Sequence, residues 1–412
     1  MYKVMFVFLL LVFLPMSIFS STSISQCTEI NSSYSFDTDR TIVFNQNITS
    51  NDSSCIVFNT ISNVTIDCNN YFLIGNTSNS KGFDLSRPNI DNISIHNCNI
   101  ENFNSGFYVQ NQFDFLLSIQ NITLNNISGS TGFPVSAPMY FSIVSLTNES
   151  VVRNITIYNS EEVAVTLDSV ILFMEDLIII NSTGYGIFVQ GSSINLSNFT
   201  IEKTQSDGIR LRLIDNSNFD SITIRNVDSG FFIVDAVNTT INNTYVSNSS
   251  SYGIEFVGFT SSNYENIIVS NTEIRDSQRG FGVPVNTDTS SEVYIYGNTF
   301  VNNTNYNLFI PTETYPGLDI YIYNNTLGNI SKIDVPSSTS NSIYFNLSSM
   351  GNTYYNTSIY SGIYCFEATI CDNQAQVTLF PVVSQVLEQA TSSLFPFTSI
   401  ISLLLVIMYF LF

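Results

Sequence analysis

Apolar and polar residues alternate in short stretches that recur along the chain between residues 63 and 349. Each stretch is a six-residue unit with an apolar residue at its fourth position and usually another at its second. Copies start at Asn63, Asn92, Asn121, Asn154, Asp176, Asn198, Ser221, Asn243, Asn266, Glu292, Asp319 and Asn341. Because side chains on a β-strand point alternately to opposite faces, this period of two predicts a half-buried strand in every unit.

Two features of the unit indicate how the strands are connected. The fourth position is apolar in every copy, from Ile66 to Tyr344, so it is expected to point into a common core. The sixth position is usually Asn, which tolerates the left-handed backbone of a turn and can donate a side-chain hydrogen bond to a stacked copy. From Asn154 to Asn266 the copies start 22 or 23 residues apart, which predicts one unit per turn of a stack.

A second signal follows about ten residues into each central unit. Glycine precedes another apolar stretch at Gly186, Gly208, Gly230 and Gly253. A glycine turn there predicts the start of a second strand. A strand, an Asn turn and a Gly turn within 22 residues do not fit a helical repeat. The sequence therefore predicts an all-β, single-stranded parallel β-helix, a solenoid of about 12 coils that each rise about 4.8 Å around an apolar interior.

Two stretches carry a resemblance to a known family. The sequences from Asn63 to Asn70 (N-V-T-I-D-C-N-N) and from Asn92 to Ile100 (N-I-S-I-H-N-C-N-I), followed by Gly106-Phe-Tyr-Val, resemble the right-handed parallel β-helix repeat family. That family shares the pectate-lyase-like superfold and is common among surface proteins. The resemblance covers roughly residues 40–350 and implies right-handed coils. Lyases, hydrolases, adhesins and scaffolds share the superfold, so the resemblance leaves the activity open.

The two ends of the chain have the composition of targeting segments. Residues 1–25 are similar to a secretory signal peptide, with Lys3 before an apolar stretch. Residues 394–412 form an apolar tail after a polar spacer at 381–393, with no basic residue behind it. This order favours a GPI-attachment signal over a retained membrane helix, and either one would place the protein at a membrane. Between the ends we expect an N-terminal cap and first coil at 26–62, the repeats at 63–349 and a C-terminal cap at 350–380.

Composition and charge exclude several classes of protein. The chain has 12 Lys and Arg residues against 33 Asp and Glu, a net charge of −21 that repels phosphates, so no nucleic-acid partner is expected. An apolar fraction of 44% can bury a core and argues against disorder. The single histidine, His96, leaves little room for histidine-based metal or acid–base chemistry.

Six cysteines indicate a secreted protein with disulfides, among fifteen connectivities. They are Cys27, Cys55, Cys68, Cys98, Cys365 and Cys371. Cys68 and Cys98 fall at the sixth and seventh positions of neighbouring units, close enough to bridge. The last two cysteines would close a small loop, and the first two would then staple the N-terminal cap. A zinc site is disfavoured because no C-x₂-C pair is present.

The 21 glycosylation sequons include two groups defined by the repeat. Those that begin strands are expected to carry glycans, at Asn63, Asn92, Asn121, Asn154 and Asn198. Those in the Asn turns are expected to be buried and unmodified, at Asn126, Asn181, Asn248, Asn324 and Asn346.

Charge density is highest between residues 203 and 235. The candidate catalytic residues there are Asp207, Arg210, Arg212 and Asp215. Pectate-lyase-like enzymes place acidic Ca²⁺ ligands and a basic residue on an outer face, so the resemblance implies a polysaccharide lyase or hydrolase as one alternative. The other alternative is a solvated salt-bridge ladder between coils, with Glu202 beside Arg225. Few basic residues and an acidic chain favour the ladder.

One further constellation involves the single histidine. Asp67 and His96 occupy outward positions of neighbouring units and Ser94 shares their face, which allows a Ser–His–Asp arrangement. An open sheet without evident oxyanion donors favours an exposed surface histidine instead. Because His96 stands between Ile95 and Asn97, the chain also lacks the Gly-His-Gly segment of polygalacturonase-type hydrolases.

Four tyrosines occupy outward positions near the C-terminal end, one pair above the other. They are Tyr294, Tyr296, Tyr321 and Tyr323. Stacked tyrosines can form a platform for sugar rings or for a protein partner. The alternative that we favour is packing, for instance beneath residues 350–372.

These observations predict a secreted, glycosylated β-helix rod anchored at the extracellular face of a membrane. Its expected role is structural or adhesive, with glycans or neighbouring surface proteins bound along its lateral faces. The alternative is a polysaccharide lyase or hydrolase. No cofactor is expected, except Ca²⁺ under the lyase alternative. Convergence of the four charged candidates in one pocket would favour the enzyme, and a flat face of paired charges would favour the scaffold.

Overall fold

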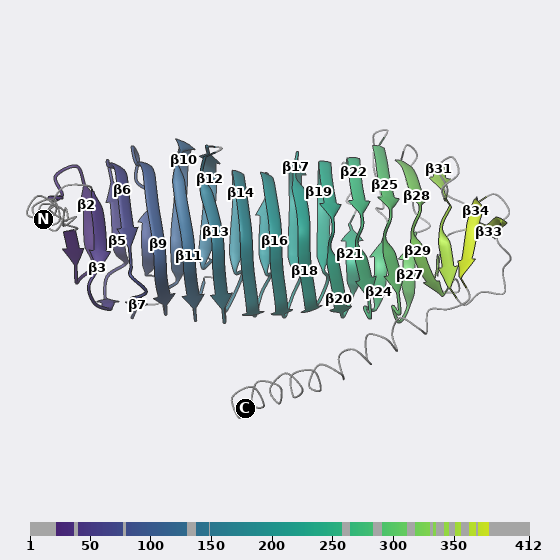
Figure 1. The fold of residues 1–412 in the computed structure, drawn as a ribbon, viewed down its shortest axis with the longest axis horizontal. Coiled ribbons are helices and arrows are strands. Elements are labelled where there is room, and N and C mark those ends of the chain that lie inside the picture. Colours follow the sequence, from purple (N-terminus) through teal and green to yellow (C-terminus); the bar gives the residue numbers. More distant parts are fainter. Residues whose placement is uncertain are drawn as a thin grey trace, which may run out of the picture.

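The fold is a parallel β-solenoid of about 11 turns, close to the 12 coils predicted, and the described residues contain no helix. The computed structural model describes residues 22–36, 40–76, 80–129, 137–147, 149–257, 264–282, 291–310, 318–329, 333–334, 342–345, 351–355, 362–367 and 370–378. The turns stack along one axis into a long rod (Figure 1). Within these ranges no helix is long and apolar enough to cross a membrane.

The strands follow one another in short segments. The first turns contain β1 (Thr22–Ile24), β2 (Thr28–Asn31), β3 (Thr41–Phe44), β4 (Ile48–Ser50), β5 (Ser54–Asn59), β6 (Ser62–Asp67), β7 (Phe72–Gly75), β8 (Lys81–Leu85) and β9 (Asp91–Glu101). The middle turns contain β10 (Ser105–Phe115), β11 (Leu117–Asn125), β12 (Met139–Leu146), β13 (Val151–Tyr158), β14 (Val165–Ser182), β15 (Ile187–Gln190), β16 (Ser193–Thr204), β17 (Ile209–Asp215), β18 (Asn218–Val227), β19 (Phe231–Asn242), β20 (Tyr245–Ser249) and β21 (Tyr252–Phe256). The last turns contain β22 (Tyr264–Ser270), β23 (Glu273–Arg275), β24 (Arg279–Gly282), β25 (Ser291–Tyr296), β26 (Thr299–Val301), β27 (Tyr306–Phe309), β28 (Leu318–Tyr323), β29 (Thr326–Asn329), β30 (Ile333–Asp334), β31 (Ser342–Tyr344), β32 (Thr353–Tyr355), β33 (Gly362–Glu367) and β34 (Ile370–Thr378).

Most strands pair in parallel with the strand at the same place one turn later. β16 pairs with β14 and β18, and β17 pairs with β15 and β19, so these two sets of strands form two walls of the rod. Since successive turns share a register, residues at one position form a column along the axis. Alternate columns point into the core and out of it.

The interior is a stack of aliphatic side chains from successive turns. Ile179, Ile201 and Ile224, at the fourth position of their units, lie in register and are completely buried. The predicted second strands are present, but the glycines before them serve close packing rather than a left-handed turn. A Cβ on Gly208 would lie 2.6 Å from Ile224 Cγ2 and 2.9 Å from the carbonyl oxygen of Gly230. Only glycine therefore lets this backbone approach the isoleucine column.

The sequence units do not all occupy the same place in a turn. Ile95, for example, pairs with Ile119, which belongs to no unit. The assignment of the last unit was wrong by one residue, because Tyr344 pairs with Tyr321 on the outer face and is 42% exposed. The buried position belongs to Phe345. Of two adjacent aromatic residues, the one without a hydroxyl is the less costly to bury.

The predicted Asn turns form hydrogen-bonded columns on the outside of the rod. Asn126, Asn181 and Asn248 have left-handed backbones with φ between 52° and 65°. The amide nitrogen of Asn181 lies 2.7 Å from the Asn side-chain oxygen one turn earlier. These three residues and Asn324 are exposed, so the prediction that the turn sequons are buried is wrong, since a surface column satisfies the same hydrogen bonds. Asn346 lies outside the described residues.

A different asparagine column is buried near the C-terminal end. Asn298 donates to the side-chain oxygen of Asn325, and Asn325 donates to that of Asn352, each at 3.0 Å. Their side chains also donate to inward backbone carbonyls, as Asn325 does to Ile295 at 2.8 Å. The column therefore satisfies polar groups that would otherwise be stranded in the core.

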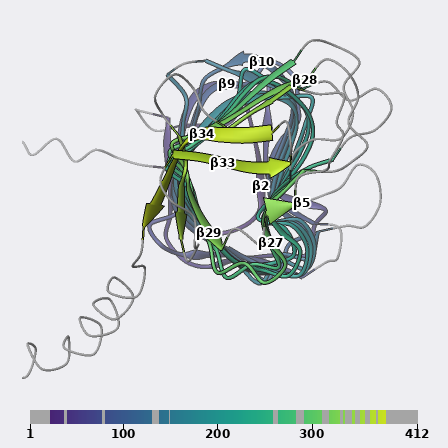
Figure 2. The same ribbon diagram turned by 90° about the vertical axis from the view of Figure 1, so that its right-hand side faces the viewer.

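The solenoid extends into both predicted caps. β1 pairs with β3, although its residues fall inside the predicted signal peptide, so cleavage after Ser25 would remove this strand. At the other end, β33 and β34 form an antiparallel hairpin that lies across the end of the rod (Figure 2). Residues 1–21, the spacer at 381–393 and the apolar tail at 394–412 lie outside the described residues, so the signal and the anchor stay predictions.

Two disulfides join neighbouring turns at the N-terminal end. The pairs are Cys27–Cys55 and Cys68–Cys98, as the spacing favoured. Cys365 lies opposite Cys371 in the β33–β34 hairpin, and their bond stays a prediction. Disulfides form and persist in oxidising compartments, which indicates an extracytoplasmic location.

Candidate functional site

A charged and aromatic cluster lies on the outer face of the central turns. Its residues occupy two columns of outward side chains. One column is formed by the residues directly before the glycine of each second strand, and the other by the residues two positions after that glycine. The members are Tyr185, Asp207, Arg210, Phe232, Tyr252, Glu255 and Arg279, which we call the arginine–carboxyl cluster. Parallel pairing of β17, β19 and β21 places Arg210, Phe232 and Glu255 in successive turns. Tyr252 pairs with Arg279 in the same way.

Arg210 on β17 is held between two aromatic rings. Its Cζ lies 4.9 Å from the ring centroid of Tyr185 and 4.4 Å from that of Phe232. Its Nη1 donates to Tyr185 Oη at 2.5 Å and lies 3.6 Å from Asp207 Oδ2. The rings and the hydroxyl fix the guanidinium plane, while 34% of the side chain stays exposed. Arg210 can therefore meet a ligand without losing much rotamer freedom.

Arg279 on β24 has a similar environment. Its Nη1 donates to Tyr252 Oη at 2.7 Å, and its Cζ lies 4.8 Å from the Tyr252 centroid and 5.8 Å from that of Phe309. Tyr252 can lie there because Gly282 has no Cβ, which would come within 2.9 Å of the ring. The Nε of Arg279 is buried and has no hydrogen-bond partner in the described part of the chain. A buried guanidinium nitrogen without an acceptor is costly, so the stability of the rod alone does not account for this arrangement.

Two carboxyl groups of the cluster have raised pKa values. Burial raises the pKa of Asp207 to about 6, against the opposing effect of Arg210. Burial, together with the charge of Asp207, raises the pKa of Glu255 to about 7, against the opposing effect of Arg279. Ser229 donates a hydrogen bond to Glu255. At slightly acidic pH the cluster therefore holds protons that ordinary surface carboxylates would have released.

This set of groups suits the recognition of polyhydroxylated ligands. Fixed arginines donate in a planar fork, aromatic rings offer apolar surface, and the carboxyl groups accept hydrogen bonds or, when protonated, also donate them. Asp207 is only 4% exposed and lies beside Arg210, whereas the half-buried Glu255 faces the surface more openly.

The structure brings together two of the four residues predicted from charge density. Asp207 and Arg210 belong to the cluster. Arg212 is exposed in the neighbouring outward column of β17. Asp215, at the end of that strand, is also exposed and accepts a hydrogen bond from Asn238 Nδ2 at 3.3 Å. The four residues therefore do not converge.

The predicted salt-bridge ladder has the expected register on the wall formed by β14, β16 and β18. Glu202 on β16 lies directly opposite Arg225 on β18. The ion pair of Glu202, however, is with its neighbour Lys203 at 3.6 Å, and the Cζ of Arg225 lies 5.2 Å from the ring centroid of Tyr245. Exposed charges next to one another in sequence compete with those across the ladder, and each such pair is weak.

Sequence reasoning missed the other part of the cluster. The missed residues are Tyr185, Phe232, Tyr252, Glu255 and Arg279. A signal for them was present, because each stands one residue before or two residues after a glycine of the second strands. Comparing the same position in successive turns would have found these columns, whereas local charge density did not.

The four tyrosines predicted to bind a ligand form two stacked columns, one of which also contains Tyr344. Tyr294, Tyr321 and Tyr344 lie with centroids 4.8 and 4.9 Å apart and rings tilted by 9° and 11°. Tyr296 and Tyr323 lie 5.2 Å apart with a tilt of 12°. We call these five residues the tyrosine ladder. Because stacked rings cover one another's faces, no sugar ring fits between them, and a ligand would meet ring edges and hydroxyls. Ligand binding there stays a prediction.

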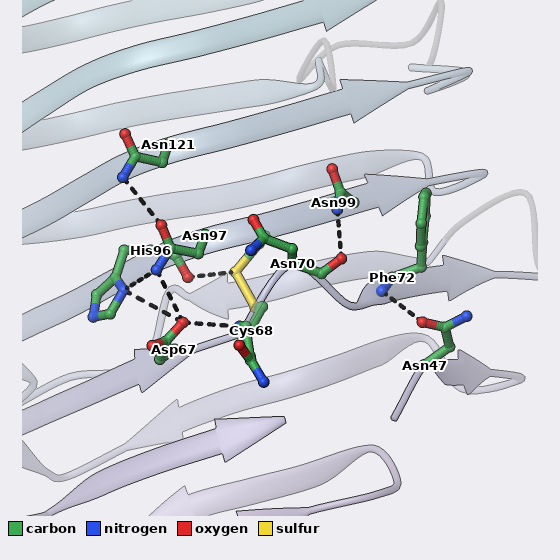
Figure 3. Close-up of a disulfide and its surroundings, with 11 residues drawn as sticks. Asn47, Asp67, Cys68, Asn70, Phe72, His96, Asn97, Asn99 and Asn121 are labelled. Carbon is green, nitrogen blue, oxygen red and sulfur yellow. Dashed lines mark hydrogen bonds and ion pairs between the residues drawn. A yellow bond between two sulfur atoms is a disulfide. The ribbon is translucent and has the colours of Figure 1, made fainter. Parts of the chain in front are cut away.

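His96 lies beside the second disulfide (Figure 3). Its Nδ1 is 3.6 Å from Asp67 Oδ1 and 3.0 Å from Asn97 Nδ2. The same Asp67 oxygen accepts hydrogen bonds from the backbone of Asn69 at 2.8 Å and from Asn97 Nδ2 at 3.1 Å. Asp67 therefore organises the turn around the disulfide, while Ser94 takes its regular place in the β6–β9 ladder.

The remaining site predictions concern metals and glycans. In the described ranges no group of three or more His, Cys, Asp or Glu side chains is placed to hold a metal ion. The five strand-start sequons are exposed, at Asn63, Asn92, Asn121, Asn154 and Asn198. Their side chains join the surface columns, as Asn154 Nδ2 donates to Asn121 Oδ1 at 2.6 Å. A glycan replaces one of two Nδ2 hydrogens, so the other can still donate, and glycosylation stays a prediction.

Comparison with known proteins concerns the fold. Among solved structures, the chain is similar to the A-module of the mannuronan C-5 epimerase AlgE6 from Azotobacter vinelandii, with 10% identity, 74% of this chain and 90% of that chain covered, and a TM-score of 0.47. It is also similar to a periplasmic alginate epimerase AlgG, with 12% identity, 76% of each chain covered and a TM-score of 0.38. A GH136 lacto-N-biosidase from Eubacterium ramulus is 9% identical, with 83% of this chain and 63% of that chain covered and a TM-score of 0.33. No curated protein matches the chain in sequence.

A match to a family model gives the handedness of the coils, which the repeat pattern of the sequence does not determine. The model is described as a right handed beta helix region and matches residues 142–263. This range contains every member of the arginine–carboxyl cluster except Arg279. Together with the parallel register of the strands, the match shows that the chain has the right-handed parallel β-helix, or pectate-lyase-like, fold.

Proposed function

We propose that the protein is an extracytoplasmic β-helix scaffold that binds carbohydrate on its lateral face, at the arginine–carboxyl cluster. The observation that carries this proposal is the pair of partly buried arginines, Arg210 and Arg279, each fixed by a tyrosine hydroxyl and two aromatic rings. Arginines that only balanced surface charge would not need such fixed positions. As the sequence predicts, the rod would stand on the outer face of a membrane and adhere to glycans around it.

The spacing of the cluster suits an extended glycan. Successive turns rise by about 4.8 Å, close to the length of one sugar residue in an extended polysaccharide. Arg210, Phe232 and Glu255 occupy three successive turns, so a glycan lying along the rod would meet one of these groups with each sugar. Arg279 lies one turn further on, and its half-buried guanidinium group would donate to a hydroxyl or carboxylate of the ligand.

The proposal is tested with the purified full chain on a glycan array, followed by titration of the best glycan. Arg210→Ala and Arg279→Ala should each weaken binding by about tenfold or more, the value of one charge-assisted hydrogen bond. Arg225→Ala is the matched control, because Arg225 lies opposite Glu202 on the other wall, in the β16–β18 ladder, and should leave binding unchanged. Absence of any bound glycan, or equal losses in all three variants, would refute the proposal.

An enzymatic role is favoured by a different observation. Glycoside hydrolysis needs one protonated and one ionised carboxyl group. Asp207 and Glu255 lie two turns apart on the same face, and between pH 6 and 7 the first is mostly ionised and the second mostly protonated. The release of reducing ends from the bound glycan tests this alternative. Turnover that disappears in Asp207→Asn and Glu255→Gln while binding persists would make the protein an enzyme.

A further inference from the structure

The tyrosine ladder consists of two columns of phenols that the carbohydrate-binding proposal does not use. Its rings come from β25, β28 and β31 in three successive turns near the C-terminal end of the rod. Tyr321 stacks on Tyr294 on one side and on Tyr344 on the other, and Tyr296 stacks on Tyr323 beside them. The centroids of neighbouring phenol rings therefore lie 4.8–5.2 Å apart throughout the ladder.

The ladder is accessible and has a proton acceptor at one end. Tyr344 is 42% exposed, and the other four rings are half-buried. The hydroxyl of Tyr294 donates to Glu292 Oε2 at 2.8 Å. A phenol that loses an electron becomes strongly acidic, so a carboxylate at hydrogen-bond distance can take the proton at once. Both requirements for tyrosine oxidation, access to an oxidant and a place for the proton, are met at this surface.

We propose that the tyrosine ladder is an oxidative cross-linking site, at which a haem peroxidase and hydrogen peroxide join tyrosines of neighbouring turns into dityrosine within one chain. Each tyrosine loses one electron and its hydroxyl proton. The two phenoxyl radicals form a carbon–carbon bond between positions ortho to the hydroxyls, and each ring then moves its ortho hydrogen to oxygen. The peroxide takes up the two electrons and two protons and becomes two water molecules, so atoms and charge balance.

The position of the ladder gives such a bond a structural role. In the described residues both disulfides between turns, Cys27–Cys55 and Cys68–Cys98, lie at the N-terminal end of the rod. The tyrosine ladder joins turns at the opposite end. A link from β25 to β28 or from β28 to β31 would fasten these last turns covalently, as the disulfides fasten the first ones. The oxidising compartment that the disulfides indicate is also one in which peroxide chemistry is not suppressed by cytosolic thiols.

A second tyrosine stack in the same chain provides an internal comparison. Tyr108 and Tyr140 lie 5.0 Å apart with a tilt of 10°, so their geometry matches that of the ladder. Tyr140 is only 3% exposed, however, and Lys81 Nζ lies 3.5 Å from the centroid of Tyr108. A neighbouring cation opposes oxidation of a ring, and burial excludes the peroxidase. If stacking alone were sufficient, cross-links would form in both stacks. Because oxidation also needs access to the peroxidase and a proton acceptor, we expect cross-links only in the tyrosine ladder.

The experiment treats the purified, disulfide-bonded full chain at low concentration with a haem peroxidase and hydrogen peroxide. Dityrosine fluorescence, the intact mass and tandem mass spectrometry of proteolytic peptides report the products. We expect a monomer that has lost two hydrogen atoms per link, with links between peptides of β25 and β28 or of β28 and β31. Links found only between chains, or spread over exposed tyrosines in general, would overturn the proposal, as would a link between Tyr108 and Tyr140.

Variants separate the ladder from other tyrosines. Tyr321→Phe combined with Tyr323→Phe removes one phenol from each column but keeps rings to stack. The fold is therefore expected to persist, and most of the dityrosine signal should disappear. Tyr158→Phe removes a tyrosine that is 38% exposed and outside the ladder, and it should leave the signal unchanged. Equal signals in the double variant and the wild type would contradict the assignment. Glycan binding of the double variant should remain normal, because the arginine–carboxyl cluster is intact.

Discussion

Replacing Glu255 by Gln should stabilise the protein at high pH and leave its stability unchanged at low pH. The raised pKa of Glu255 has burial as its first cause, followed by the charge of Asp207. Its carboxyl group therefore ionises near pH 4.5 in the unfolded chain and at about 7 in the folded one. Between these values the folded state holds a proton that the unfolded state has released, so stability falls as pH rises through this range. Above about pH 7 the full cost of the buried charge is present.

The magnitude follows from the size of the pKa change. Raising the pKa from 4.5 to about 7 corresponds to about 3 kcal/mol, since one pKa unit is worth about 1.36 kcal/mol. Glu255 is half-buried, and solvent screening reduces this to about 1–2 kcal/mol. For a solenoid of this length, that free energy corresponds to an increase of about 2 °C in Tm. Gln keeps the shape of the side chain and cannot ionise, so the variant should gain this amount at pH 8 and nothing at pH 4.5.

Thermal and urea unfolding of Glu255→Gln and the wild type at both pH values measure the effect. The control is Glu265→Gln on β22, where the glutamate is exposed and its replacement should change Tm equally at the two pH values. A difference between Glu255→Gln and the wild type that is the same at pH 4.5 and pH 8 would show that the buried charge is not its cause. Lower stability of the variant at pH 8 would refute the sign of the argument.

Three further substitutions test the packing of the rod. Gly208→Ala should cost about 1–3 kcal/mol in urea unfolding, because the new methyl group would lie 2.6 Å from Ile224 Cγ2. In Gly191→Ala the methyl group meets only Ser169 Oγ at 3.5 Å, so the cost should be the smaller one of a left-handed backbone, about 1 kcal/mol. Asn325→Ala should cost about 2–4 kcal/mol, because it strands polar groups that the buried column satisfies, and hydrogen exchange at its neighbours should accelerate.

The solenoid was predictable because its repeat combines two periods. Alternation of period two fixes which residues face inward, and the spacing of 22 or 23 residues fixes where the chain returns. The register was not predictable where apolar residues follow one another without alternation. Around Tyr344 and Phe345 either residue fits the inward column, so the partner strand decides. The handedness of the coils cannot be read from the spacing of the repeat, because left-handed and right-handed coils would give the same spacing.

The candidate site was predictable only in part, for a related reason. Charge density along the chain finds residues that are close in sequence, and it found Asp207 just before β17 and Arg210 near the start of that strand. Glu255 and Arg279 reach the same surface from later turns, and neither belongs to the charge-dense stretch of the sequence. The raised pKa of Asp207 depends on burial, although its place on the outer face predicts exposure.

The two outward arrays differ in a way that follows from the repeat itself. A solenoid places equal positions of successive turns about 4.8 Å apart, a distance at which identical side chains satisfy one another. Tyrosine stacks on tyrosine and Asn donates to Asn, so such columns need nothing from outside to be stable. In the arginine–carboxyl cluster the residue type changes at every turn, from Arg210 to Phe232 to Glu255, and this mixture leaves Arg279 with a buried nitrogen that no neighbour in the described part of the chain satisfies. Stability of the rod does not require that arrangement, and this is why we assign binding to the mixed column and a structural role to the uniform ones.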